Sequence, residues 1–172
     1  MGYTTDFSGS INIEPPLNQK EIDYLNTFFQ ARHDKHNDTM SPQPKNFTSY
    51  GKSEEKFGPW CDLVISDDGK ELLWNGAEKS YNMSEWVTYI IEHFIGDNPL
   101  SAQNDQAFDY FVAHTLNGEL EAQGEEEDDH WYLVVKNNEV FTYDDNDYEK
   151  LQVKEDLEKN LPNEKSRLSY KI

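Results

Sequence analysis

The stretch Leu116–Asp145, LNGELEAQGEEEDDHWYLVVKNNEVFTYDD, decides the fold. Apolar and small residues occupy alternate positions from Leu116 to Ala122, as in a strand with one buried face. Residues 131–135 and 140–143 are rich in aromatic and β-branched side chains, and Asn137-Asn138 separates these two runs. Strand formers divided by turn residues are typical of hairpins. The stretch therefore predicts three antiparallel strands in a meander.

The earlier part of the chain adds further strands. Residues 3–14 predict a strand that ends at Pro15-Pro16, because proline lacks the N–H that a ladder needs. Residues 60–65 and 71–74 predict a hairpin around the turn Asp67-Asp68-Gly69. We therefore expect an antiparallel sheet built from one strand, one hairpin and the meander.

The first predicted helix begins at Asn18. Glu21 follows three residues later, a spacing typical of a capping box. Ile22, Leu25 and Phe29 then recur at helical spacing and give the helix an apolar face. We expect this helix to end near residues 32–36.

The second predicted helix has the clearest apolar face. Asn82 and Glu85 predict another capping box, and Trp86, Ile90 and Phe94 form one apolar row at four-residue spacing. Gly96 is expected to end the helix in the left-handed C-cap conformation. A short helix is expected around Ala107, Phe108, Phe111 and Val112. The tryptophans at 74, 86 and 131 are expected in the core.

These elements predict an α+β fold in which two amphipathic helices cover one face of an antiparallel sheet. Residues 1–146 are expected to form one domain, with 37–59 as a long polar loop. Residues 147–172 are expected to form a polar C-terminal tail that is partly helical, over about 154–161, or frayed.

Charge narrows the class of partner. The formal net charge is −19, from 34 acidic residues against 15 lysines and arginines. Nucleic acids and anionic membranes are disfavoured as direct partners, because binding them requires cationic side chains. A host or phage protein with a basic surface is the expected partner, since such charge steers association with it. The sequence leaves the oligomeric state open.

The chain has one cysteine, Cys61, so it cannot form an intramolecular disulfide. Its position beside Trp60 in a predicted strand favours a buried, unreactive thiol. The N-terminus lacks the charged and apolar regions of a secretory signal, and no run has the ~18 apolar residues of a membrane span. We expect a cytoplasmic protein, in the host cytoplasm if it is phage-encoded, without a cofactor.

Several segments resemble one protein family. They are the opening MGYTTDFSG, Trp60-Cys61, the run LWNGAEKSY at 73–81, Glu85-Trp86, the run IIEHF at 90–94, and LNGELEAQGE at 116–125 with Trp131 and Val134-Val135 after it. The chain is similar in these places to small acidic proteins of tailed phages and of bacteria. It departs from them at residues 37–59 and in its longer tail. The resemblance implies a phage or prophage accessory protein and carries over no functional residue.

The densest charge lies in and after the predicted meander, where twelve acids between 119 and 149 face a single lysine, Lys136. The expected partner-binding residues are Glu119, Glu121, Glu125, Glu126, Glu127, Asp128, Asp129, Asp144, Asp145, Asp147 and Glu149. The acids need not form one patch. On a meander, we expect that the first loop and the end of the third strand can lie at opposite ends of the sheet. The same residues are also compatible with a solvated turn that discourages edge pairing.

Metal binding is the less favoured interpretation of several groups. Residues 144–149 carry carboxylates but lack the glycine and distal glutamate of a calcium loop. His33 and His36 are three residues apart, and His114 and His130 are candidates to meet across neighbouring strands. A zinc site needs three or four ligands held together, so neither pair predicts one.

Two other classes of function remain open. The first is a small enzyme that uses His93, His114 or His130 with a carboxylate in a pocket between sheet and helices. The second is a virion or assembly component, which should carry a large apolar patch for self-association. The favoured hypothesis is a non-enzymatic protein that binds a partner through its acidic surface, inhibiting nucleic-acid-handling or defence machinery, for instance by imitating nucleic-acid phosphates.

Overall fold

The computed structural model describes residues 2–30, 58 and 60–160, which contain a six-stranded antiparallel sheet with the order β2-β3-β1-β4-β5-β6. The strands are β1 (Thr5–Glu14), β2 (Leu63–Ile65), β3 (Glu71–Trp74), β4 (Thr115–Gly124), β5 (His130–Lys136) and β6 (Glu139–Asp144). The helices are α1 (Gln19–Gln30), α3 (Met83–Ile90) with its π-helical continuation η1 (Ile91–Ile95), α4 (Leu100–Asn104), the 3-10 turn η2 (Gln106–Phe108) and α5 (Asp145–Lys159).

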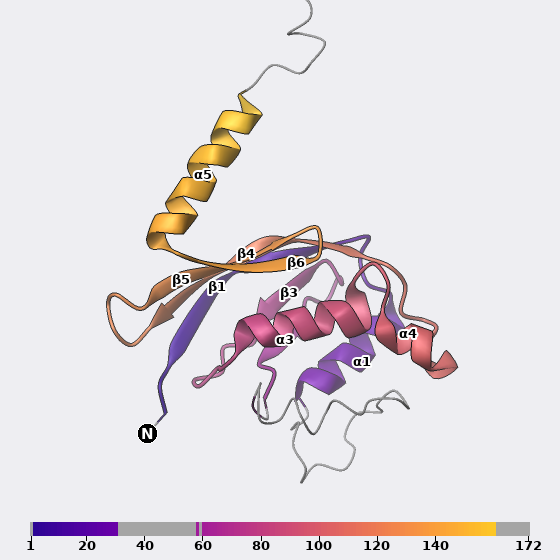
Figure 1. Ribbon diagram of the computed structural model, residues 1–172. Coiled ribbons are helices and arrows are strands. Elements are labelled where there is room, and N and C mark those ends of the chain that lie inside the picture. Colours follow the sequence, from indigo (N-terminus) through magenta and orange to yellow (C-terminus); the bar gives the residue numbers. More distant parts are fainter. Residues whose placement is uncertain (1, 31–57, 59, 161–172) are drawn as a thin grey trace, which may run out of the picture.

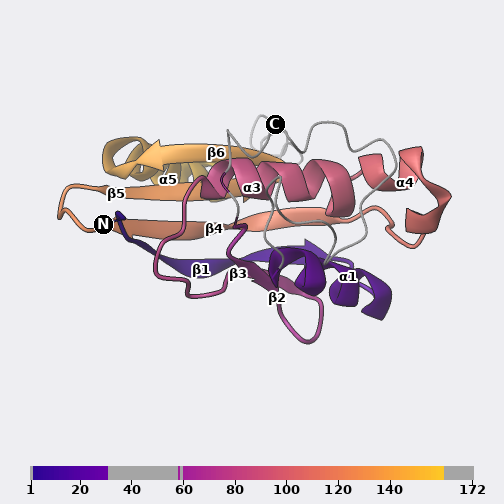
Figure 2. The same ribbon diagram turned by 90° about the horizontal axis from the view of Figure 1, so that it is seen from below.

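Helices α1 and α3 cover one face of the sheet, whereas α5 starts on the opposite face (Figure 1). Seen from the helix side, α3 lies across the β4–β6 half of the sheet and α1 lies over the half that contains β2 and β3 (Figure 2). The predicted α+β fold, with an antiparallel sheet and two amphipathic helices on one face, is confirmed.

The centre of the sheet is the long pair β1–β4, which runs in register from Thr5 opposite Gly124 to Glu14 opposite Thr115. Alternate residues of β4, including Leu116 and Leu120, are buried against the helices. Hairpin turns then place β5 and β6 in order, so the predicted meander is confirmed.

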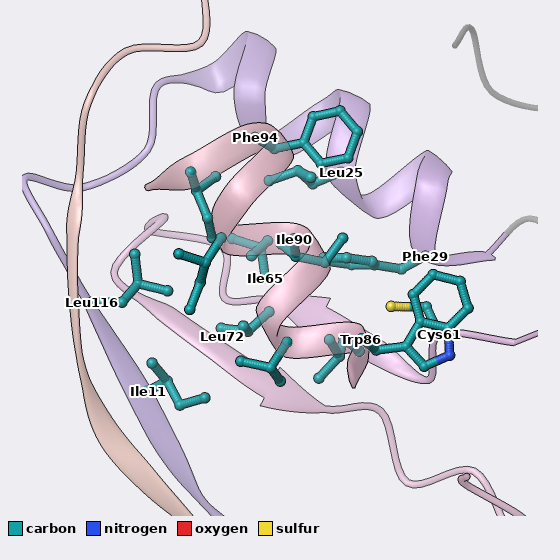
Figure 3. Packing of buried hydrophobic residues seen from close by; sticks show 14 of the residues in the cluster. Ile11, Leu25, Phe29, Cys61, Ile65, Leu72, Trp86, Ile90, Phe94 and Leu116 are labelled. Carbon is teal, nitrogen blue, oxygen red and sulfur yellow. The ribbon is translucent and has the colours of Figure 1, made fainter. Parts of the chain in front are cut away.

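The core lies between this sheet and the two helices (Figure 3). Helix α3 brings Trp86, Ile90 and Phe94 into it, and each of these side chains is at most 1% exposed. Cys61 is fully buried there, as expected, and its burial raises the thiol pKa. Trp74 and Trp131 are only partly buried but pack against this cluster.

The start of α1 confirms the first predicted capping box. The backbone N–H of Asn18 donates to Glu21 Oε1 at 2.9 Å, and the N–H of Glu21 donates to Asn18 Oδ1 at 2.9 Å. Two N–H groups that the helix cannot pair are therefore satisfied by side chains.

The two predicted caps of α3 are wrong. Asn82 has φ 56 and its side chain caps no N–H, because the left-handed backbone replaces the extended conformation that a capping side chain requires. Gly96 is extended, with φ −86 and ψ −164, instead of left-handed. A glycine is needed there because an added Cβ would lie 2.6 Å from the Ile91 carbonyl oxygen, which accepts the Gly96 N–H at 2.7 Å.

Three boundaries also differ from the prediction. Strand β2 starts at Leu63 instead of Trp60, because Asp62 has a positive φ of 58 and Trp60 is 46% exposed. The helix expected around 107–112 is replaced by α4 and the 3-10 turn η2, and Val112 is exposed. Helix α5 starts at Asp145, well before the predicted 154, because Asp144 caps it.

The loop expected at 37–59 lies almost entirely outside the described residues, as does any extension of α1 beyond Gln30.

Candidate functional site

The acidic segments lie at one end of the sheet. Gln123 at the end of β4 faces His130 at the start of β5, and Trp131 faces Asp144 at the end of β6. The chain reverses direction twice between the end of β4 and the end of β6. The β4–β5 turn and the β6–α5 junction therefore lie at the same end of the sheet. The expectation that these segments can lie at opposite ends is wrong. We call Glu125–Asp129 together with Asp144, Asp145, Asp147 and Glu149 the acidic end.

Two acids of the β4–β5 turn are engaged by the N-terminal segment. The backbone N–H of Thr4 donates to Glu125 Oε1 at 2.7 Å, and the hydroxyl of Tyr3 donates to Asp129 Oδ2 at 2.5 Å. The hydrogen bond to Asp129 raises the pKa of Tyr3. Glu125 and Asp129 therefore hold the turn against the start of β1.

The other three acids of this turn are Glu126, Glu127 and Asp128. All three side chains are exposed, and none of them forms a hydrogen bond or ion pair with another described residue. Asp147 and Glu149, in the first turns of α5, are also exposed. These five carboxylates are the part of the acidic end whose side chains form no hydrogen bond or ion pair with another described residue.

His130 links three elements on the sheet face that carries α5. Its Nε2 lies 2.7 Å from Glu121 Oε1 of β4, and its Nδ1 contacts Asp145 Oδ1 of α5. Hydrogen bonds to Asp145 and then to Glu121 raise the pKa of His130. An imidazolium between two carboxylates therefore ties the start of α5 to the sheet.

Tyr148 provides a second link between α5 and the sheet. Its hydroxyl lies 2.6 and 2.7 Å from the two carboxylate oxygens of Glu119, and its ring stacks on Tyr132 at 3.5 Å between centroids. Burial, followed by the hydrogen bond to Glu119, raises the pKa of Tyr148. Glu119 and Glu121, predicted as partner-binding residues, thus serve to attach α5.

The sequence prediction grouped all eleven acids as one set of partner-binding residues because of their charge. The structure separates those that contact other described residues from those that do not. Asp144 accepts the N–H of Asp147 at 2.8 Å and so acts as the cap of α5. His130, Tyr3 and Tyr148 were missed as residues that organise this end. Their contacts join positions 9 to 126 residues apart, and local spacing gives no signal for such pairs.

The structure contradicts two of the less favoured metal-binding interpretations. Residues 145–149 are part of α5, so they cannot wrap around a cation as a calcium loop does. His114 lies just before the start of β4 while His130 is opposite Gln123 near its end, so these two histidines do not meet. Among the described residues, no group of three or more His, Cys, Asp and Glu side chains could hold a metal ion. His33 and His36 lie outside the described residues.

The histidines named for an enzyme occupy three different settings. His114 pairs with Glu21, and both side chains have no exposed surface. His93 stacks on Tyr89 at 3.9 Å, and burial lowers its pKa. His130 is occupied by two carboxylates. The three histidines are therefore engaged separately, each by different described residues.

No protein-family model, curated protein or solved structure matches this chain. Within the described part of the chain, no helix has the length and apolar character needed to cross a membrane.

Proposed function

We propose that this chain is a non-enzymatic, phage-type accessory protein that binds a basic surface of a host or phage protein through its acidic end. The observation that supports this proposal most directly is the convergence of two acidic segments on one end of the sheet. Glu126, Glu127, Asp128, Asp147 and Glu149 remain exposed there. The resemblance to acidic phage proteins favours a host protein as the partner, and machinery that handles nucleic acid offers basic surfaces of the required kind.

Electrostatic docking of this kind acts mainly on the rate of association. A cluster of like charges raises the encounter rate with an oppositely charged protein by a factor of about 10 to 1,000 at low ionic strength. Screening shortens the reach of these charges from about 10 Å at 0.1 M salt to about 3 Å at 1 M. The complex should therefore form readily at low salt and be lost at high salt.

The test is affinity capture of partners from bacterial lysate with the tagged full-length chain, at about 0.1 M and about 1 M salt. The test variant carries Glu126→Gln, Glu127→Gln and Asp128→Asn, which spare the structural contacts of Glu125 and Asp129. The control variant carries Glu14→Gln, Asp67→Asn and Asp109→Asn. It removes the same charge from exposed positions near the opposite end of the sheet. Glu14 faces Thr115 at that end. Asp67 and Asp109 lie close in sequence to Lys70 and Tyr110, whose carbonyl oxygens accept hydrogen bonds from Ile13 and Asn18 there.

We expect one dominant protein at low salt, lost at high salt, and association slowed by about tenfold or more in the test variant only. Equal binding by the test variant and the parent at low salt would contradict the proposal. So would equal loss in both variants, because net charge alone would then account for binding.

A further inference from the structure

Strand β6 is an outer strand of the sheet and pairs only with β5 among the described strands. The turn between β5 and β6 consists of Asn137 and Asn138, whose φ values are 48 and 72. Positive φ at both central residues identifies a two-residue type I′ hairpin. In such a hairpin the flanking residues, Lys136 and Glu139, form a hydrogen-bonded pair.

Hydrogen-bonded pairs alternate along an antiparallel ladder, so this turn fixes the direction of every backbone group in β6. Phe141 and Tyr143 direct their N–H and C=O groups towards β5. Val140 and Thr142 direct theirs away from it, towards the free edge. Neither residue makes a backbone hydrogen bond outside its strand to another described residue. Two N–H groups and two C=O groups are therefore presented at the edge.

A groove runs beside this edge. Its wall on the helix side is formed by α3 and η1, and its wall on the sheet side by Val140 and Thr142. The groove has a volume of about 390 Å³, and it is lined by Ser84, Glu85, Thr88, Tyr89, Glu92, Val140 and Thr142. A second hollow of about 300 Å³, lined by Trp131, Thr142, Tyr143 and Asp144, continues along β6 towards the acidic end.

The two charged residues that line the groove are both acidic. Glu85 and Glu92 lie on its helix wall, two turns apart on α3 and η1, while Glu139 and Asp144 stand at the two ends of β6. No lysine or arginine of the described residues forms an ion pair with any of these four. A second copy of β6 would bring the same acids against them, which disfavours pairing between two copies of the chain.

We propose that the free edge of β6 and the groove beside α3 bind an extended, lysine- or arginine-rich segment of a partner protein by strand addition. The backbone of this segment pairs with Val140 and Thr142. Its basic side chains, on the same side as those of Val140 and Thr142, reach Glu85 and Glu92, and the side chains between them lie beside Phe141 and Tyr143. Backbone pairing supplies affinity in this mode and the alternating pockets supply specificity. This proposal does not rest on the acidic end.

The probe is a fluorescein-labelled peptide, Lys-Val-Lys-Thr-Lys-Val-Lys, titrated into the full-length chain and followed by fluorescence polarisation. Two versions carry N-methyl groups, one on the internal lysines only and the other on Val and Thr only. Both keep the charge, but each removes the N–H groups of one edge. A peptide added as the outermost strand pairs through only one of its own edges, so the two versions must differ.

We expect one methylated version to bind at least about tenfold more weakly than the parent peptide, because it loses two or more hydrogen bonds, and the other to bind as the parent does. Loss on methylating the lysines indicates antiparallel addition, and loss on methylating Val and Thr indicates parallel addition. The variant Glu85→Gln/Glu92→Gln should weaken the parent peptide, and amide NMR signals of Val140 and Thr142 should shift most on binding.

Equal affinity of the two methylated peptides would overturn strand addition, as would unchanged binding by Glu85→Gln/Glu92→Gln or no binding of the parent peptide. The acidic-end variant of the capture experiment separates the two proposals. If peptide binding is lost in that variant but not in Glu85→Gln/Glu92→Gln, the peptide binds the acidic end and the groove proposal is wrong. If the acidic-end variant still binds the peptide but no longer captures a partner, the groove binds the peptide independently of the acidic end.

Discussion

His114 Nε2 lies 2.8 Å from Glu21 Oε2, and neither side chain has any exposed surface. The other ring nitrogen, Nδ1, lies 2.6 Å from the carbonyl oxygen of Pro15, which can only accept, so Nδ1 carries a proton. The carboxylate of Glu21 also accepts the N–H groups of Asn18 and Val112. Two segments that are far apart in sequence, residues 15–21 and 112–114, therefore meet at one buried, hydrogen-bonded imidazolium–carboxylate pair.

This pair predicts a pH-dependent stability. Burial by itself lowers the pKa of His114, but the hydrogen bonds to Glu21 and Pro15 outweigh it, and the pKa is raised above its ordinary value near 6.5. A raised folded-state pKa means that the contribution is complete below about pH 6.5 and is lost as the pH rises through the folded-state pKa. Urea unfolding at a series of pH values between about 5 and 8, where histidine titrates, should show this decline.

The matched substitution is Glu21→Gln, which retains a capping side chain for α1 but removes the charge. We expect a loss of about 3–5 kcal/mol in the free energy of unfolding at low pH, since one buried charge is left unpaired. The decline with pH should disappear in this variant. An unchanged pH slope would mean that other groups cause it and that His114 is neutral in the folded protein.

The contacts of His130 predict that the attachment of α5 also depends on pH. The groups that face this ring are Glu121 of β4, Asp145 of α5 and, at 5.0 Å between ring centroids, Tyr132 of β5. Hydrogen bonds to Asp145 and then Glu121 raise its pKa, so the tether is complete below about pH 6.5 and weakens as the pH rises through the raised value. The ring NMR signals of Tyr132 and Tyr148, which stack at 3.5 Å, should move towards unstacked positions over that range.

His130→Asn should show the unstacked signals at every pH, because asparagine cannot form the charged link. Lys136→Ala is the control, since it removes only the exposed ion pair with Glu155, which solvent screens. Tyrosine signals that are independent of pH in the parent protein would show that Tyr148 and Glu119 hold α5 without His130.

The order and type of the main elements could be predicted because apolar periodicity is a local signal. Leu116, Leu120 and Ala122 show the strand period, and Trp86, Ile90 and Phe94 show the helix period, and all six are buried. Caps were less predictable, because Asn18 and Asn82 have the same sequence context of an acid three residues later. The backbone at Asn82, with φ 56, distinguishes them, and the spacing of the acid gives no signal for that angle.

These two asparagines therefore give opposite expectations. Asn18→Ala should reduce the free energy of unfolding by about 1 kcal/mol, as loss of a helix cap does. Asn82→Gly should be within a few tenths of a kcal/mol of the parent, because glycine adopts a positive φ without strain and no cap is lost. Urea unfolding of both variants checks this, and equal destabilisation would show that Asn82 contributes an interaction beyond its backbone conformation.

The candidate site could be predicted only as a set of acids. Charge density identifies Glu125–Asp129 from the sequence, but its division into structural and free carboxylates depends on Tyr3 and Thr4, more than 120 residues away. The shared end of the two acidic segments, by contrast, follows from the meander itself. Two hairpin turns bring β6 back to the end where β4 stops, so this feature could have been predicted from the sequence.

The close approach of β1 and β4 gives a last prediction, at Gly118. Its φ is 152, and an added Cβ would lie 2.4 Å from the backbone carbonyl oxygen of Ser10. Gly76 is the matched control, because its φ of 84 is also positive but a Cβ there would meet nothing within 4 Å. Both Gly→Ala variants incur backbone strain, and only Gly118→Ala adds a collision with backbone.

We expect Gly118→Ala to destabilise the protein by about 1–3 kcal/mol more than Gly76→Ala, as overpacking does. The β1–β4 register also places Thr5 opposite Gly124, next to the turn that Tyr3 and Thr4 hold. The amide signal of Thr4 should therefore shift in Gly118→Ala and stay in place in Gly76→Ala. Equal stability of the two variants would mean that β1 can move away from β4 without loss, and the position of the acidic end would then not depend on this strand pair.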